Sequence, residues 1–138
     1  MGFPVVNGLR GIEFGTKGTF RDALNDLVLS GTKKATAGLL ESDYQAENEP
    51  VETIGERLAV LNNEGIHIAT IQVTDVSVTK FSEVPNSFAL AEGEGDLSSE
   101  DFKASHLKYW TKNGANISDE TLVVLVYFNL IEDLRGSL

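Results

Sequence analysis

Two lysines and a threonine lie close together in the segment 31–36 (GTKKAT). A lysine amine that is withdrawn from water can act as a base toward a nearby hydroxyl, and the activated hydroxyl can attack a carbonyl carbon. A simpler interpretation places both lysines on the surface, where they complement the negative end of a preceding helix. The spacing leaves both interpretations open, so Lys33, Lys34 and Thr36 are candidate site residues.

A second candidate segment, 91–96 (AEGEGD), places three carboxylates among glycines. Oxygen ligands of this kind bind divalent cations, and a carboxyl that keeps its proton can serve as an acid. The segment matches neither an EF-hand loop nor a GxGxxG fingerprint, and the chain has no P-loop pattern. A solvated turn is the plainer alternative, which leaves Glu92, Glu94 and Asp96 as candidates for a proton donor or a cation site.

A third candidate is the helix face that carries His106, Tyr109 and Trp110. An imidazole and two aromatic rings on one face could stack on a nucleobase and contact its edge. Such a face more often belongs to a hydrophobic core. We expect Trp110 to pack in the core, whereas His106 and Tyr109 remain candidates for substrate contacts.

The element that positions the lysines is a predicted helix starting at Thr19. Its apolar residues recur at helical spacing: Phe20, Ala23, Leu24, Leu27 and Val28. Thr19 and Asp22 predict a variant of the capping box, and Gly31 predicts the end of the helix. The lysine segment would then lie on a turn held by that helix end.

Strands are predicted at Arg57–Leu61 and Ile66–Lys80, joined by a hairpin turn. The alternation of apolar residues in the second strand slips near Ala69-Thr70 and again near Thr74-Asp75, which predicts two β-bulges. Thr121–Ile131 is almost wholly apolar and predicts an interior strand covered on both faces. Together these patterns predict a small, curved sheet or barrel with helices packed against it.

Shorter signals complete the chain. Residues 86–91 predict a short helix that ends at Gly93, and Ser98 or Ser99 predicts the cap of a longer helix that Gly114 ends. The segment 41–56 contains six acidic residues and no basic one, which favours an exposed loop. Residues 1–18 show no clear periodicity, so we expect an N-terminal arm over 1–12 and one domain over 13–138.

Composition limits the class of protein. The 138 residues carry 21 acidic and 11 basic side chains, a formal net charge of −10, with 41% hydrophobic residues. One compact domain is expected, and an acidic chain disfavours binding of long duplex nucleic acid. A modified nucleoside or a short RNA element is easier to accommodate.

The absence of cysteine excludes disulfides and thiolate nucleophiles and fits a reducing cytoplasm. The chain starts without a basic segment followed by a long apolar stretch, so we expect no export signal. The longest apolar run, 122–128, is far shorter than the roughly 20 residues of a membrane helix. We therefore expect a cytoplasmic protein with no membrane partner.

The order of these motifs resembles the ASCH domain family over about residues 13–132. The matching segments are 27–36 (LVLSGTKKAT), 49–50 (EP), 54–55 (IG), 92–96 (EGEGD), His106 and 122–124 (LVV). The resemblance implies an α+β fold, a PUA-like curved β-barrel with helices around a cleft. Family members include RNA-binding modules, a metal-dependent ribonuclease and small bacterial amidohydrolases that remove the acetyl group of N(4)-acetylcytidine.

By motif position, the resemblance assigns Lys33 as the catalytic lysine of the amidohydrolases, Thr36 as the nucleophile and Glu94 as the catalytic glutamate. Where the family commonly has Lys-Thr, this chain has Lys33-Lys34. We expect no cofactor and no metal for this reaction. The substrate-binding residues are expected to be Lys34, Glu92, His106 and Tyr109.

Two other hypotheses follow from the same residues. In the first, the domain binds RNA without catalysis, with Lys33 and Lys34 on phosphate and Tyr109 stacked on a base. In the second, the carboxylates of the 92–96 segment hold a metal that cleaves RNA. The amidohydrolase is the leading hypothesis because it gives a role to the lysine, the threonine and the glutamate together.

Overall fold

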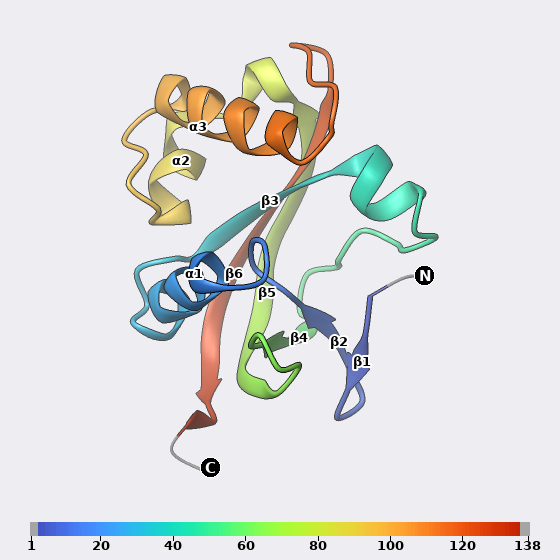
Figure 1. The fold of residues 1–138 in the computed structure, drawn as a ribbon, viewed down its shortest axis with the longest axis vertical. Coiled ribbons are helices and arrows are strands. Elements are labelled where there is room, and N and C mark those ends of the chain that lie inside the picture. Colours follow the sequence, from blue (N-terminus) through green and yellow to red (C-terminus); the bar gives the residue numbers. More distant parts are fainter. Residues whose placement is uncertain (1–2, 136–138) are drawn as a thin grey trace.

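The structure, a computed structural model, describes residues 3–135. Its centre is a six-stranded mixed sheet with the strand order β1-β2-β4-β5-β6-β3 (Figure 1). The strands are β1 (Val5–Val6), β2 (Leu9–Ile12), β3 (Ala35–Leu39), β4 (Arg57–Leu61), β5 (His67–Lys80) and β6 (Leu122–Asp133). The helices are α1 (Thr19–Leu29), the π-helical turn η1 (Leu40–Gln45), the 3-10 turn η2 (Phe81–Glu83), α2 (Asn86–Glu92) and α3 (Ser99–Lys112).

The long strands β5 and β6 pair in antiparallel fashion along most of their length. The pairing of β5 is irregular near both predicted bulges, because Ile68 is an extra residue against β4 and Thr74 is an extra residue against β6. A further register shift between Thr70 and Ile71 comes from an extra residue in the partner strand, Ile131 of β6. Each bulge bends its strand and increases the local twist. The predicted hairpin between β4 and β5 is confirmed as well.

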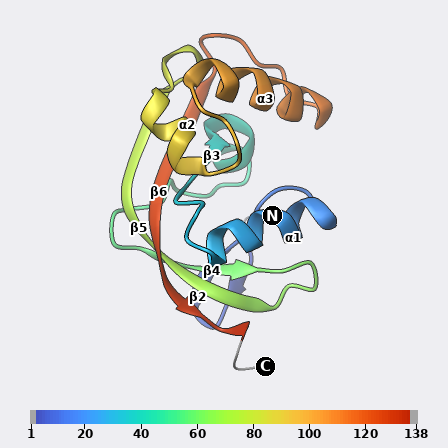
Figure 2. The same ribbon diagram turned by 90° about the vertical axis from the view of Figure 1, so that its left-hand side faces the viewer.

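Strand β6 separates two hydrophobic cores. Val124 and Val126 belong to one core, which includes residues of α1, β4 and β5. Val123 and Leu125 belong to the other, which includes residues of α2 and α3. Because successive residues of a strand point to opposite faces, the two cores cover both faces of β6, and the predicted interior strand is confirmed. Figure 2 shows α2 and α3 beside the upper end of the long strands and α1 beside their lower half.

Helix α1 forms where its apolar stripe predicts it, but its cap differs from the prediction. The N-cap is Gly18, which makes no side-chain cap hydrogen bond. Asn63, from the β4–β5 turn, donates to the Asp22 carboxylate (3.0 Å) and accepts from the Gly18 amide (2.8 Å). The predicted capping box of Thr19 and Asp22 is therefore wrong, because a tertiary contact satisfies this helix end instead.

The helices on the other side begin at the predicted residues and end within two residues of the glycines that were predicted to stop them. The hydroxyl of Ser98 accepts a hydrogen bond from the Asp101 amide at the start of α3 (3.2 Å). Gly93 closes α2 in the left-handed conformation, with φ of 64°. Trp110 is 7% exposed and packs in the core with α2, which confirms its expected structural role.

Residues 5–12, within the segment predicted as an N-terminal arm, add β1 and β2 to the sheet. Strand β2 pairs in parallel with β4 through Arg10, Gly11 and Ile12. A Cβ atom at Gly11 would lie 2.8 Å from the end of the Leu61 side chain and 3.2 Å from the Pro4 carbonyl oxygen, so glycine eases the close packing there. Strands of two and four residues are too short for alternation to reveal, which explains why the sequence pattern did not predict them.

The α+β class is confirmed, but the strand pairing among residues 3–135 leaves the sheet open rather than closed into a barrel. Strands β1 and β3 are its two edges, because β1 pairs only with β2 and β3 only with β6. The long strands nevertheless curve strongly (Figure 2). No helix in this part of the chain is long and apolar enough to cross a membrane.

Candidate active site

A cleft of about 750 Å³ is enclosed by segments that lie far apart in the sequence. Its walls come from the loop before α1, strand β3, turn η1, the α2–α3 loop and one face of α3. Six predicted site residues line it: Thr36, Glu92, Glu94, Asp96, His106 and Tyr109. The fold therefore brings most of the predicted site residues around one cavity.

The backbone before Lys33 is fixed by the end of α1. The amides of Thr32 and Lys33 both donate to the Leu27 carbonyl, each at 3.0 Å. Gly31 permits this turn because its φ is 80°, a conformation in which a side chain is strained. The predicted helix stop thus directs the lysine side chain away from solvent.

The Lys33 ammonium is only 1% exposed and is surrounded by acceptors. Its Nζ donates hydrogen bonds to the Ala35 carbonyl (2.7 Å) and to the Glu94 carboxylate. A second carboxylate, that of Glu92, lies 3.7 Å away. An isolated charge is costly to bury, so these two glutamates are what allow the lysine to remain inside.

A close backbone approach holds the lysine turn against the glutamate segment. The Lys34 amide donates to the Ala91 carbonyl at 2.8 Å. A Cβ atom at Gly93 would lie 2.3 Å from the Thr32 carbonyl oxygen, so only glycine fits at this position. The glycine between the two glutamates therefore lets both carboxylates reach Lys33.

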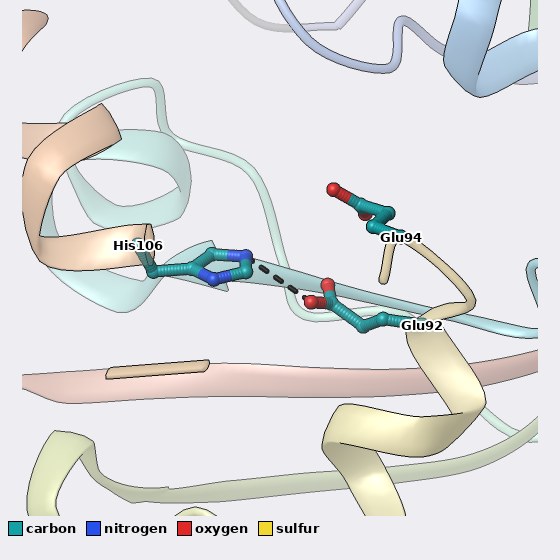
Figure 3. Close-up of side chains that lie close together, drawn as sticks. All are labelled: Glu92, Glu94 and His106. Carbon is teal, nitrogen blue, oxygen red and sulfur yellow. Dashed lines mark ion pairs between the residues drawn. The ribbon is translucent and has the colours of Figure 1, made fainter. Parts of the chain in front are cut away.

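The other side of Glu92 contacts His106, as Figure 3 shows. The Glu92 carboxylate is 1% exposed, and its Oε1 lies 3.1 Å from His106 Nε2. The imidazole also stacks on Phe102, with ring centroids 3.9 Å apart, and its Nδ1 lies 3.1 Å from the Phe102 carbonyl. Burial alone lowers the pKa of His106, but the contact with Glu92, the charge of Glu94 and the Phe102 carbonyl outweigh burial and raise it overall.

Thr36 and Gly38 lie on the cleft side of β3. The alternate residues Ala35 and Leu39 are buried in the core with α2 and α3, so the opposite face of the strand carries Thr36 and Gly38. Tyr109 forms part of the facing wall and packs against Phe20 with ring centroids 5.5 Å apart. This arrangement offers a hydroxyl and an aromatic surface to a bound ligand.

The structure separates one predicted residue from the others. Lys34 is exposed and does not line the cleft, because adjacent residues at the start of β3 point in different directions. Asp96 does line the cleft, where its carboxylate accepts a hydrogen bond from the Ser105 hydroxyl (2.8 Å). The first lysine of the pair is thus the buried one.

Sequence reasoning missed a second polar group at the far end of the cleft. Tyr44 and Glu52 are buried, and the tyrosine hydroxyl donates to the Glu52 carboxylate at 2.8 Å. Asp43 lies beside them, and its Oδ2 accepts a hydrogen bond from the Leu39 amide (2.8 Å). Burial raises the pKa of Asp43, Glu52 and Tyr44. The only sequence signal was a lone aromatic residue in an otherwise acidic loop.

Within residues 3–135, one group of side chains has donor atoms close enough together for a metal ion. Ligand atoms of Glu92, Glu94 and His106 lie within 4.8 Å of one another (Figure 3). Lys33 Nζ contacts both glutamates, so its ammonium already offsets one of their two negative charges. A divalent cation bound there would compete with the lysine.

Comparison with known proteins supports the assignment suggested by the motifs. The model of the ASCH domain family matches residues 10–132. An ASCH domain structure from Lactobacillus crispatus is 28% identical, with a TM-score of 0.74, and the match covers 88% of this chain and 79% of that one.

The crystal structure of protein EF3133 from Enterococcus faecalis is 25% identical with a TM-score of 0.78, and the match covers 91% of this chain and 77% of that one. No curated protein matches the sequence. The family match spans most of the chain and includes the lysine turn, the glutamate segment and the central strands. The chain belongs to the ASCH domain family.

Proposed function

We propose that this protein hydrolyses the exocyclic amide of N(4)-acylated cytosine nucleosides. The observation that carries the proposal is the buried hydrogen bond between Lys33 and Glu94, beside a cleft that Thr36 lines. Moving one proton along this bond converts the charged pair into a neutral amine and a carboxylic acid. Those are the general base and the general acid that amide hydrolysis requires.

In the first step, the Thr36 hydroxyl attacks the acyl carbonyl carbon and its proton passes to the Lys33 amine. The bond between the carbonyl carbon and N4 breaks, and Glu94 donates its proton to the leaving nitrogen. The products of this step are the free cytosine nucleoside and an ester on Thr36. Lys33 is then an ammonium and Glu94 a carboxylate, as in the paired state of the structure.

In the second step, water attacks the threonine ester. Glu94 accepts a proton from the water. The water oxygen bonds to the acyl carbon, and the bond between that carbon and the Thr36 oxygen breaks. The Lys33 ammonium returns a proton to that oxygen. The free carboxylic acid departs, and all three side chains regain their starting protonation states.

The remaining polar groups fit positioning roles in this scheme. Glu92 is almost fully buried between Lys33 and His106, so it holds these two side chains rather than offering a large surface to substrate. Tyr109 offers a ring on which a pyrimidine can stack. His106 closes the same wall of the cleft.

The test is chromatographic detection of cytidine released from N(4)-acetylcytidine by the purified protein. We expect release by the wild type and loss of release in Thr36→Ala, because the nucleophile is absent. The matched control is Thr74→Ala, an exposed strand threonine outside the cleft, which should retain activity. Full activity of Thr36→Ala would show that the nucleophile is assigned incorrectly.

A second candidate function is metal-dependent RNA cleavage, favoured by the proximity of Glu92, Glu94 and His106. It requires a cation to displace Lys33 from the two glutamates. EDTA separates the two functions: amide hydrolysis as proposed is unaffected, whereas metal-dependent cleavage of a short RNA is abolished. If neither substrate is converted and a salt-sensitive RNA complex forms, the domain binds RNA without catalysis.

A further inference from the structure

The far end of the cleft is built from a different part of the chain than the lysine end. Ser42, Asp43 and Tyr44 come from η1, and Glu52 comes from the loop that follows. None of these residues has a role in the amide hydrolysis described above. Their presence in the wall of the same cavity points to contacts with a part of the substrate that does not react.

A glycine of β3 lets the far end of the cleft pack closely against the strand that carries Thr36. Thr36 and Gly38 lie two residues apart on one face of β3, a separation of about 7 Å. A Cβ atom at Gly38 would lie 3.4 Å from Asp43 Oδ2 and 3.1 Å from a ring carbon of Tyr44. The Asp43 carboxylate therefore lies beside Gly38, two residues along β3 from Thr36.

Asp43 has acceptor capacity left for a ligand. Among the described hydrogen bonds, its side chain uses Oδ2 for the Leu39 amide, and Oδ1 has no described partner. The neighbouring Tyr44 hydroxyl is already committed to Glu52. A carboxylate with a free oxygen suits hydroxyl donors, as when an acidic side chain binds the hydroxyls of a ribose.

The charge of the cleft restricts the ligand further. The acidic side chains in its wall are Glu13, Asp43, Glu52, Glu92, Glu94 and Asp96. The lining contains no lysine or arginine, and Lys33 behind it is paired with two of these acids. A phosphate would be repelled by such a wall, whereas a neutral sugar would not.

Resting on the function proposed above, we propose that Asp43 and the adjoining Tyr44–Glu52 pair form a sugar subsite in which Asp43 accepts hydrogen bonds from the pentose hydroxyls. The substrate is then a free nucleoside rather than a nucleotide or an RNA chain. A free N(4)-acylated nucleoside forms when RNA is hydrolysed to nucleotides and a phosphatase then removes the phosphate. Those two classes of reaction must therefore supply the substrate.

The kinetic test compares N(4)-acetylcytidine, N(4)-acetylcytosine, which lacks the sugar, and N(4)-acetylcytidine 5′-monophosphate. In the wild type, loss of the sugar should raise KM about tenfold or more, the equivalent of one charge-assisted hydrogen bond. The 5′-monophosphate should be a poorer substrate than the nucleoside. Equal KM values for the three compounds would overturn the subsite while leaving amide hydrolysis intact.

The variant Asp43→Asn tests the residue itself and retains an oxygen for the Leu39 amide. It should raise KM for the nucleoside several-fold, leave KM for the base unchanged and leave kcat for both within about twofold. Glu41→Gln, an exposed acid on the same turn that lies outside the cleft, is the matched control and should change neither. An equal rise in KM for base and nucleoside in Asp43→Asn would overturn the role of Asp43.

A binding measurement keeps the subsite testable if no amide is hydrolysed. Calorimetric titration of the wild type with cytidine and with cytosine needs no turnover. Tighter binding of cytidine, reduced to that of cytosine in Asp43→Asn, supports the sugar subsite even where the proposed reaction fails. Equal binding of the two compounds, or no binding of either, overturns it.

Discussion

The two ends of the cleft solve the problem of burying charge in different ways. At the lysine end, Lys33 and His106 each contact a buried glutamate, so each basic side chain lies directly beside an acidic one. At the far end, the buried carboxylate of Glu52 is stabilised by its own backbone amide and by the Tyr44 hydroxyl, and Asp43 by a backbone amide. Arg10 adds a more distant favourable charge to Glu52.

Under the proposed function, this difference assigns proton transfer to the lysine end and recognition to the far end. An acidic and a basic side chain in direct contact can exchange a proton without a change in their total charge, which is what general acid and base catalysis needs. Carboxylates held by neutral donors keep acceptor oxygens available for hydroxyl groups of a ligand. The comparison therefore predicts that substitutions at the two ends act on different measured quantities.

The largest effect is expected from Lys33→Met, which removes the amine and keeps most of the side-chain volume. The rate of N(4)-acetylcytidine hydrolysis should fall by about 1,000-fold, the contribution of a positioned general base. Lys34→Met is the control, because Lys34 is exposed and outside the cleft, and it should retain activity. The reverse pattern in the chromatographic assay would mean that the second lysine is the catalytic one.

The next largest effect concerns the backbone contact that joins the lysine turn to the glutamate segment. Gly93→Ala should lower the free energy of unfolding by about 3 kcal/mol, because its Cβ meets the Thr32 carbonyl at 2.3 Å. Gly95→Ala has a positive φ but open space around it, so about 1 kcal/mol is expected. Urea unfolding of both variants measures the difference, and equal losses would contradict a steric role for Gly93.

A smaller effect should follow Tyr44→Phe at the far end. Removing the hydroxyl leaves the buried Glu52 oxygen without its donor, which should cost about 1–3 kcal/mol in the free energy of unfolding. Tyr127→Phe is the control, since that hydroxyl has no described hydrogen bond among residues 3–135. The kcat of Tyr44→Phe should stay close to wild type, and a large fall in kcat would place this pair in the chemistry.

The smallest effect is a pH dependence at the lysine end. The pKa of His106 is raised above its ordinary 6.5, so the folded protein binds this proton more tightly than the unfolded chain. Its contribution to stability is fully present below pH 6.5 and is lost as the pH rises through the folded-state pKa. Unfolding measured across this window should show a negative slope that decreases in His106→Gln. Identical slopes in the two proteins would contradict the ion pair with Glu92.

Sequence patterns predicted the lysine end because its geometry depends on local signals. A helix stop at Gly31 directs Lys33 inward, and a helix stop at Gly93 turns Glu92 and Glu94 toward it. Alternation in the second predicted strand slipped near Ile68 and Thr74, the residues that are extra against β4 and β6, since each extra residue shifts the side-chain phase. These features each arise within a few consecutive residues.

The far end could not be predicted in this way. The position of Tyr44 beneath Gly38 depends on η1, a turn without an amphipathic pattern, and on the loop that returns Glu52 to the same place. The cap of α1 likewise depends on Asn63, distant in sequence. Such contacts are decided by tertiary packing, which a single sequence does not display.

The separate origin of η1 has a consequence for redesign. The turn and its following loop supply Asp43, Tyr44 and Glu52, whereas none of the residues that perform the proposed proton transfers lies between Leu40 and Glu56. This stretch can be exchanged as a cassette while the strands on either side, β3 and β4, stay in place. A library of variants confined to this stretch would change substrate specificity and leave the residues of the proposed reaction unchanged.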